Sequence, residues 1–281
     1  MLAKLVSDPS VKKELVSLVD IVAYRRPPAN RLFDQIYMMT GDMLTQVDLM
    51  HNYINDKKVI FLGDGDGMSM LFGLFSVKDI IKAPREMTVL DFDQRIINNV
   101  KSFSNDFKFH SRFEFNYETY NVINPVPPTH RERYNFFYIN PPYGSKNAGG
   151  STEAWLHRCM DLCTNNSAGC IIVPYDIEQP WTIKAMISIQ KFLLNNGFVI
   201  RDMVSYMHSY HLKDNPMLKS ATLIVDRYEK VSSPHSTSDL PPEFLRNLYG
   251  SPRAIPKYIR DDGLTGVPDY GWKYGEEFWD K

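Results

Sequence analysis

The sequence predicts an α/β fold built on a mostly parallel sheet, and three observations carry this prediction. From residue 58 onward, short apolar runs alternate with segments of helical periodicity. Glycine or polar residues directly follow several of these runs, as they do at the ends of buried strands. The last two runs, 198–207 and 221–228, are separated only by a loop, which predicts an antiparallel hairpin at one edge of the sheet.

Local patterns define the other elements. Apolar residues at helical spacing predict helices over residues 7–23, 40–54, 68–75, 94–102, 153–163 and 183–195. Short apolar runs predict strands over residues 58–62, 87–91, 113–116, 134–139 and 169–173. From residue 230 onward the pattern stops, and the chain becomes rich in Pro and aromatic residues. We therefore expect a helical segment over 1–56, an α/β domain over 57–228, and an extension packed on that domain over 229–281.

The composition excludes several classes of protein. With 281 residues, 43% of them apolar, and a net charge of −1, the chain is not disordered and has no general basic surface for nucleic acid. Three cysteines do not make a disulfide framework. No stretch approaches the roughly 18 apolar residues of a membrane span, and the charged N-terminus lacks the apolar core of a signal peptide. We therefore expect a soluble, cytoplasmic protein that does not bind membranes.

A glycine-rich turn follows the first predicted strand. It reads Gly63-Asp64-Gly65-Asp66-Gly67, and its glycines let the backbone turn sharply and approach a ligand closely. The two carboxylates of the turn would repel a pyrophosphate. They would attract a cation, such as the sulfonium and amine of an S-adenosylmethionine-type molecule.

The second predicted strand ends in Asp91-Phe92-Asp93. A carboxylate about 20 residues or more beyond a glycine-rich turn commonly binds ribose hydroxyls, and Phe92 is placed to lie against the adenine. A solvated turn and a calcium loop are the alternatives, although the residues after Gly67 supply none of the further ligands that a calcium loop requires. The turn and this strand end together predict a nucleoside-cofactor site.

A second motif, Asn140-Pro141-Pro142-Tyr143, follows the strand predicted over 134–139 and so belongs to the same edge of the sheet. The side-chain oxygen of Asn140 and the carbonyl oxygen of Pro141 can both accept hydrogen bonds from one amine, which orients its lone pair and disperses the developing charge. Tyr143 offers a flat face for a base or a cation. For this motif alone, a rigid turn is the alternative. Together the two motifs predict alkylation of an amine by S-adenosylmethionine or its decarboxylated form.

These residues resemble the branched-chain polyamine synthases, the N4-bis(aminopropyl)spermidine synthase family, over about residues 25–227. The Asn-Pro-Pro-Tyr motif is also similar to motif IV of amino-directed DNA methyltransferases. The resemblance implies a class I methyltransferase-like (Rossmann-like) sheet with helices on both faces, and decarboxylated S-adenosylmethionine as donor. It also implies that the family's essential aspartate falls on Asp66. The chain departs from the family at Gly65 and Asn140, which stand where the family has aspartate.

The resemblance further implies residues that bind the acceptor. Asp34 and Gln35 are similar to the family's Asp-Gln element, and Tyr210 is similar in order and spacing to a later family residue. A further acidic residue is expected after the Pro-Pro-Tyr motif, and the candidates are Glu153, Asp176 and Glu178. No metal site is expected, because the His and Cys residues between 157 and 170 fit no zinc spacing.

Three functions remain open on the sequence. The first is aminopropyl transfer to a polyamine-like, small-molecule amine, which predicts an acidic cavity. The second is methylation of N6 of adenine or N4 of cytosine in a nucleic acid, which predicts an open cleft beside Tyr143 and a basic rim that contacts phosphates. The residues available for such a rim are Arg25, Arg26, Arg31, Lys57 and Lys58. The third is a non-catalytic sensor that binds the nucleoside. The oligomeric state is open as well.

Overall fold

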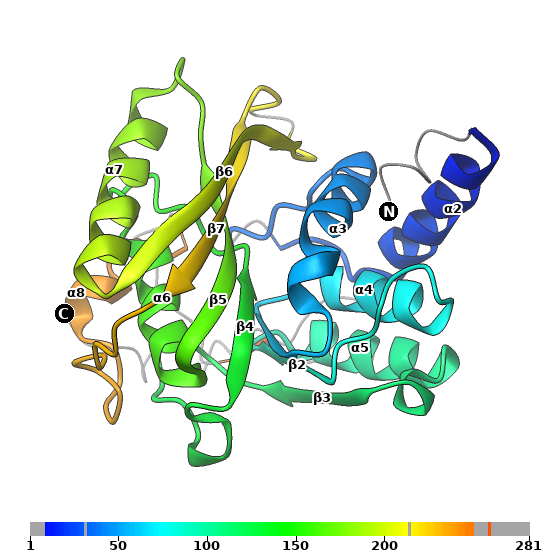
Figure 1. Ribbon diagram of the computed structural model, residues 1–281. Helices are drawn as coiled ribbons and strands as arrows, with labels where there is room; N and C mark the ends of the chain where they lie inside the picture. Colours follow the sequence, from blue (N-terminus) through cyan, green and yellow to red (C-terminus); the bar gives the residue numbers. More distant parts are fainter. Residues whose placement is uncertain (1–8, 31–32, 213–214, 250–257, 260–281) are drawn as a thin grey trace.

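The structure, a computed structural model, describes residues 9–30, 33–212, 215–249 and 258–259. Within these residues the centre is a seven-stranded sheet in the order β3-β2-β1-β4-β5-β7-β6 (Figure 1). Its strands are β1 (Lys58–Leu62), β2 (Glu86–Asp91), β3 (Glu114–Thr119), β4 (Tyr134–Ile139), β5 (Cys163–Pro174), β6 (Phe198–Ser209) and β7 (Lys219–Arg227). Strands β1 to β5 pair in parallel, and β7 pairs antiparallel with both β5 and β6. The predicted α/β fold and its edge hairpin are confirmed.

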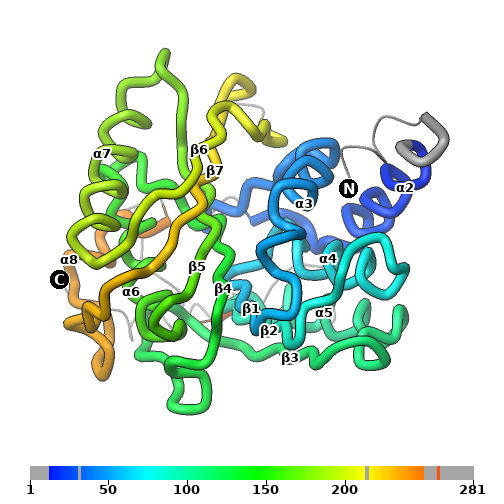
Figure 2. The backbone as a smooth tube through the Cα atoms, in the orientation of Figure 1, coloured from blue at the N-terminus to red at the C-terminus, as the bar shows by residue number. Residues whose placement is uncertain are grey.

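Helices lie on both sides of the sheet, as Figure 2 shows along the backbone. One side carries α2 (Pro9–Arg25), α3 (Thr40–Ile54), α4 (Met68–Val77) and α5 (Gln94–Asp106). The other side carries α6 (Gly150–Leu162), α7 (Pro180–Asn195) and the short α8 (Pro242–Leu245). Short 3-10 turns, η2 (Phe109–Ser111) and η3 (Pro128–His130), flank β3. Because side chains alternate along a strand, Ile60 and Phe61 of β1 enter separate apolar cores on the two faces.

The predicted elements differ from the structure mainly at their ends. The helix predicted over 153–163 occupies 150–162, because Cys163 already pairs with β4 as the first residue of β5. The strand predicted over 113–116 extends to Thr119, since pairing of its backbone with β2 defines it and its side chains are largely polar. The helix predicted over 94–102 continues to Asp106, and Phe103 is buried in its last turns.

Part of the predicted C-terminal extension packs beside the end of β2. Tyr249 is buried. The backbone N–H of Ile259 donates to the carbonyl oxygen of Phe92 (3.1 Å), and its own carbonyl accepts from the N–H of Gln94 (2.8 Å). The rest of that predicted extension, 250–257 and 260–281, lies outside the described residues, as does Arg31. Among the described residues, no helix has the length and apolar character needed to cross a bilayer.

Candidate active site

A cavity opens at the carboxyl ends of β1, β2 and β4, where the two sequence motifs meet. Its wall includes residues 63–66 of the glycine-rich turn, Asp91 and Phe92 at the end of β2, and all four residues of the Asn-Pro-Pro-Tyr motif, 140–143. Carboxyl ends of parallel strands lie at one edge of a sheet, which is why segments this far apart in sequence converge here. The predicted meeting of the two motifs is therefore confirmed.

The cavity is acidic and aromatic. The carboxylates that line it are those of Asp34, Asp64, Asp66 and Asp91. Among the described residues no Lys, Arg or His lines it. The guanidinium of Arg26 lies behind this wall, 3.9 Å from Oδ1 of Asp66 and 4.7 Å from the ring centroid of Tyr37. Carboxylates and aromatic faces together suit an organic cation.

Asp66 holds the side chain of Asn140 in one orientation. Oδ2 of Asp66 accepts a hydrogen bond from Nδ2 of Asn140 (2.6 Å), and Oδ1 accepts one from the backbone N–H of Met38 (2.7 Å). Because the amide nitrogen of Asn140 donates to Asp66, its amide oxygen is left to accept from an amine. Burial raises the pKa of the Asp66 carboxyl, against the opposing effect of these two hydrogen bonds.

Asp64 and Asp91 connect the ends of β1 and β2. The backbone N–H of Asp64 donates to Oδ2 of Asp91 (2.9 Å), and Oδ1 of Asp64 accepts from the N–H of Ser69 in the first turn of α4 (3.2 Å). Burial raises the pKa of Asp64 to about 8 and that of Asp91 to about 7. Both carboxyls therefore bind a proton near neutral pH, and a cation in the cavity would favour their ionised forms.

Two residues predicted to bind the cofactor, Gly67 and Asp93, lie outside the lining of the cavity. Asp93 caps the N-terminus of α5 and forms an ion pair with Arg95 (2.6 Å). Gly67 has a φ of +72°, and a Cβ added there would come within 2.6 Å of the Met70 side chain. Both residues support the wall of the cavity from behind.

The three acceptor-binding residues predicted before and after the motifs, Asp34, Gln35 and Tyr210, line the cavity. The hydroxyls of Tyr143 and Tyr210 hydrogen bond to each other, and Tyr210 also bonds to Ser220 (2.7 Å). The two rings are nearly perpendicular, with centroids 5.9 Å apart. Tyr143 is buried in this arrangement and contacts Tyr210 in the cavity wall, so its ring does not offer the exposed face that base methylation predicts.

The three acidic candidates after the motif are not brought to the cavity. Glu153 accepts a hydrogen bond from Oγ of Ser188 on α7 (2.6 Å). Asp176 accepts one from the backbone N–H of Glu178 (3.0 Å) in the turn before α7, and Glu178 itself is exposed. Glu153 belongs to α6 and faces α7, whereas Asp176 and Glu178 lie in the turn between β5 and α7, so none of the three reaches the cavity.

Several cavity residues were not predicted from the sequence, foremost among them Tyr37, Tyr138, Trp155 and Tyr249. The ring of Tyr249 stacks on Phe92 at 5.3 Å between centroids. The hydroxyls of Tyr138 and Tyr249 are buried without a hydrogen-bond partner in the described structure, so each can bond to a ligand. The aromatic content of the C-terminal extension was the one sequence signal for Tyr249.

The four described basic residues among those considered for a nucleic-acid rim do not gather at the cavity. Arg25 forms an ion pair with Asp106, and Arg26 is enclosed behind Asp66. Lys57 and Lys58 lie at the start of β1, at the opposite end of the sheet. Among the described residues, no group of three or more His, Cys, Asp or Glu is arranged to hold a metal ion.

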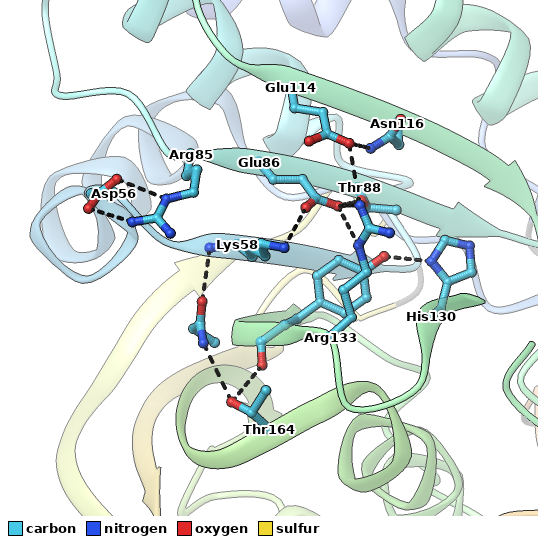
Figure 3. Close-up of polar contacts among 12 residues, drawn as sticks. Asp56, Lys58, Arg85, Glu86, Thr88, Glu114, Asn116, His130, Arg133 and Thr164 are labelled. Carbon is cyan, nitrogen blue, oxygen red and sulfur yellow. Dashed lines mark hydrogen bonds and ion pairs between the residues drawn. The ribbon is translucent and has the colours of Figure 1, made fainter. Parts of the chain in front are cut away.

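A further buried carboxylate, Glu86, lies at that opposite end (Figure 3). Its Oε2 lies 3.6 Å from Nζ of Lys58, and its Oε1 lies 2.7 Å from the guanidinium of Arg133. The same guanidinium also reaches the exposed Glu114 on β3 (3.3 Å). Glu86 is therefore held by cations that the chain itself supplies.

The mixed sheet, its antiparallel last pair and the cavity at the strand ends define a class I methyltransferase-like fold. A solved structure with this fold is the C9 mutein of the branched-chain polyamine synthase from Thermus thermophilus, in complex with N4-aminopropylspermidine and 5'-methylthioadenosine. It matches with a TM-score of 0.67 at 19% identity, over 84% of this chain and 69% of that one. A proposed RNA methyltransferase from Pyrococcus horikoshii matches with a TM-score of 0.58 at 17% identity, over 78% of this chain and all of that one.

The chain belongs to the family of the branched-chain polyamine synthase A C-terminal domain, whose model matches residues 14–242. It is 25% identical over 190 residues to the N(4)-bis(aminopropyl)spermidine synthase of Thermus thermophilus, covering 67% of this chain and 51% of that protein. It is 22% identical over 200 residues to an uncharacterized protein of Methanocaldococcus jannaschii, covering 70% and 46%. The chain thus spans about half the length of the curated relatives it matches. The family resemblance inferred from the sequence is confirmed.

Proposed function

We propose that this protein transfers an aminopropyl group from decarboxylated S-adenosylmethionine to an amine of a polyamine-like acceptor. The charge of the cavity carries the proposal, since four carboxylates line it and, among the described residues, no basic side chain does. The donor has a sulfonium and an amine, and a polyamine is protonated at neutral pH, so one acidic lining attracts both. Membership of the polyamine synthase family supports the same reaction.

The donor side of the cavity is proposed to lie at the ends of β1 and β2. Asp91 would accept hydrogen bonds from ribose hydroxyls, and the stacked rings of Phe92 and Tyr249 would border the adenine. Gly65 brings the backbone close to the ligand, because a Cβ there would already lie 3.3 Å from the ring of Tyr37. The unpartnered hydroxyl of Tyr249 supports this assignment, since a nucleoside offers it a hydrogen bond.

The acceptor side is proposed to lie at Asn140 and Pro141. Their two oxygens would accept hydrogen bonds from the reacting amine, with Asp66 keeping the Asn140 amide in place. The nitrogen lone pair then bonds to the donor carbon next to sulfur, the carbon–sulfur bond breaks with its electrons left on sulfur, and the positive charge passes to nitrogen. The acceptor nitrogen must lose its proton before its lone pair can react, and a cavity carboxylate takes that proton, because burial has raised the pKa values there towards neutral.

Base methylation is the second candidate, and one observation favours it: Asn140 stands where the resembled family has aspartate, as in the amino-directed methyltransferases. The surroundings of this residue argue against it. Tyr143 is buried, and the described basic side chains among those considered for a phosphate-binding rim lie elsewhere. The complete Asn-Pro-Pro-Tyr motif likewise argues against a sensor without catalysis.

The test is to identify the nucleoside that the purified protein releases. Decarboxylated S-adenosylmethionine or S-adenosylmethionine is supplied with spermidine or DNA, and the products are analysed by mass spectrometry. We expect release of 5'-methylthioadenosine only when the decarboxylated donor and spermidine are supplied together. Release of S-adenosylhomocysteine with DNA alone would replace the proposal by base methylation. Tight donor binding without either product would replace it by the sensor.

A matched pair of variants links the product to the cavity. Asp66→Asn removes the charge that fixes Asn140 and is expected to lower kcat about 100-fold. Asp56→Asn makes the same change in an exposed carboxylate that pairs with Arg85 on the surface, and it is expected to leave kcat unchanged. Equal rates for the two variants would remove Asp66 from the proposed mechanism.

A further inference from the structure

We propose that the outer edge of β6 pairs with β6 of a second copy of this chain, so that two sheets join into one across a two-fold axis. β6 is the last strand of the sheet (Figure 1). Its neighbour β7 is buried over residues 220–225, whereas every residue of β6 from 201 to 206 is exposed. Because successive side chains point to opposite faces of a strand, side chains on both faces of β6 are exposed here, although Tyr53 of α3 contacts one of the faces.

The uncovered part of β6 combines an open hydrogen-bonding edge with apolar side chains. Its regular pairing is with β7, on the inner side. At the end of the strand the carbonyl oxygen of Ser209 accepts from the N–H of Met39 (3.0 Å), next to the isolated bridge between Met38 and Tyr210. Val199 and Met203 are 49% and 39% exposed, and the apolar side chain of Val204 is exposed beside them. Such edges are usually protected by shortness, by Pro, by charged side chains or by bulges. β6 has 12 residues and neither Lys nor Pro, so its charged residues and its bulge are the features that a second copy has to match. An edge of this kind is suited to strand addition.

A bulge at Arg201 decides which side chains share a face. Ile200 and Asp202 pair with consecutive residues of β7, which leaves Arg201 as the extra residue between them. Arg201 and Asp202 therefore lie on the same face. The guanidinium of Arg201 is 5.5 Å from the ring centroid of Tyr53, and the hydroxyl of Tyr53 donates to Oδ2 of Asp202 (3.1 Å).

This face pattern makes β6 complementary to itself. The register with β7 places one set of β6 side chains on the face of the strand that is directed towards Tyr53, and these are Val199, Arg201, Asp202 and Val204. It places a second group on the opposite face, and its members are Ile200 and Met203. Around a two-fold axis between residues 201 and 202, an antiparallel copy sets Arg201 against Asp202 of the partner subunit.

The same register matches the apolar residues. Val199 lies against Val204 of the partner subunit, and Ile200 lies against Met203 of the partner subunit. In a regular strand this register would set residues of opposite faces against each other, and the bulge removes that mismatch. Two apolar pairs are matched in this way, and Arg201, which also forms an ion pair with Asp226 of β7 (2.6 Å), lies against the opposite charge of Asp202 of the partner subunit. A second copy of this chain can therefore pair with the open edge of β6, and we propose it as the binding partner.

Engineered cysteines test the register. The three native cysteines are buried, so Val199→Cys/Val204→Cys supplies the accessible thiols. Mild oxidation is expected to link this double variant into a species of twice the chain mass on a non-reducing gel. Val199→Cys/Met203→Cys is the matched control, because its two thiols lie on opposite faces of the strand. It is expected to run at the mass of one chain.

Analytical ultracentrifugation tests the interface at equilibrium. The unmodified chain is expected to form a dimer, and Met203→Lys is expected to raise its dissociation constant at least about tenfold. Ile187→Lys makes the same change at an exposed residue of α7 and is expected to leave that constant unchanged. Melting curves of both variants check that they fold. A chain that stays monomeric, or a dimer that resists Met203→Lys and forms no specific cross-link, overturns the proposal. Since no readout uses catalysis, its failure is separate from failure of the proposed function.

Discussion

Strand β2 carries a buried carboxylate at each end, and the two ends differ in their surroundings. At the amino end, Glu86 lies between the cations of Lys58 and Arg133 (Figure 3). At the carboxyl end, the carboxylate of Asp91 accepts backbone N–H groups, at 2.9 and 2.8 Å, and faces a cavity that no basic side chain lines among the described residues. One charge is balanced inside the chain, and the other is left for a ligand to balance.

This difference separates structural from functional carboxylates without reference to sequence motifs. Taking a charge out of water is costly, so a buried carboxylate is either paired by the protein or exists for something that binds. Glu86 belongs to the first kind. We propose that Asp91 and its neighbour Asp64 belong to the second, and burial has raised their pKa values to about 7 and 8. Four predictions test this division, in order of decreasing effect.

The largest effect is expected from two asparagines at the ends of β4. Asn140→Ala removes the acceptor oxygen at the cavity and is expected to lower kcat by about 100- to 1,000-fold. Asn135→Ala makes the same substitution near the start of the strand, where the side chain accepts from the backbone N–H of Lys58 (3.4 Å). It is expected to leave kcat unchanged. Steady-state kinetics with spermidine measure both, and a comparable loss in Asn135→Ala would contradict the division.

At the other end of the sheet, the expected effect is on stability. Glu86→Gln leaves two cations without their buried partner and is expected to lower the free energy of unfolding by about 2 kcal/mol, with donor binding retained. Glu114→Gln, an exposed partner of the same Arg133, is expected to change it by less than about 0.5 kcal/mol. Urea denaturation measures both. Loss of donor binding in a folded Glu86→Gln variant would show that the cavity at one end of β2 depends on the ion pairs at the other end.

Donor affinity is expected to rise with pH between 6 and 8. Asp64 and Asp91 hold protons in this range because burial raises their pKa values, and a cationic donor favours the ionised forms. Binding therefore releases protons, and affinity gains up to about tenfold per pH unit for each proton released. Calorimetry in two buffers of different ionisation enthalpy counts those protons. The neutral nucleoside 5'-methylthioadenosine is the control and is expected to show a weaker pH dependence.

The smallest effect is expected at two buried tyrosines. Tyr249→Phe removes an unpartnered hydroxyl and is expected to weaken donor binding about fivefold while leaving stability unchanged or slightly higher. Tyr134→Phe removes a hydroxyl that bonds to His130 (2.6 Å). It is expected to lower the free energy of unfolding by about 1 kcal/mol without affecting the donor. Titration calorimetry and melting curves separate the two outcomes, and unchanged donor affinity in Tyr249→Phe would exclude its hydroxyl from the site.

The sequence predicted those parts of the molecule that depend on local pattern. Apolar runs followed by glycine or Asn-Pro-Pro located β1 and β4, and the strand ends then located most of the cavity. Contacts between segments far apart in the sequence could not be predicted from it. The C-terminal segment brings Tyr249 onto Phe92, and no local pattern encodes that contact. The presence of a carboxyl group was also a poor guide, because Glu153 and Asp93 carry one, as Asp91 does, yet bond to neighbouring helices and side chains.

The lining of the cavity also bears on whether the donor can alkylate the protein itself. A sulfonium donor is an alkylating agent, and thiols, imidazoles and amines are the protein groups that it attacks most readily. Among the described residues none of these lines the cavity. The three cysteines are buried elsewhere, with the pKa values of their thiols raised by burial, so that they stay in the unreactive protonated form. If the proposed function holds, the acceptor amine is the strongest nucleophile near the donor. The choice of residues that line the cavity then protects the protein from alkylation.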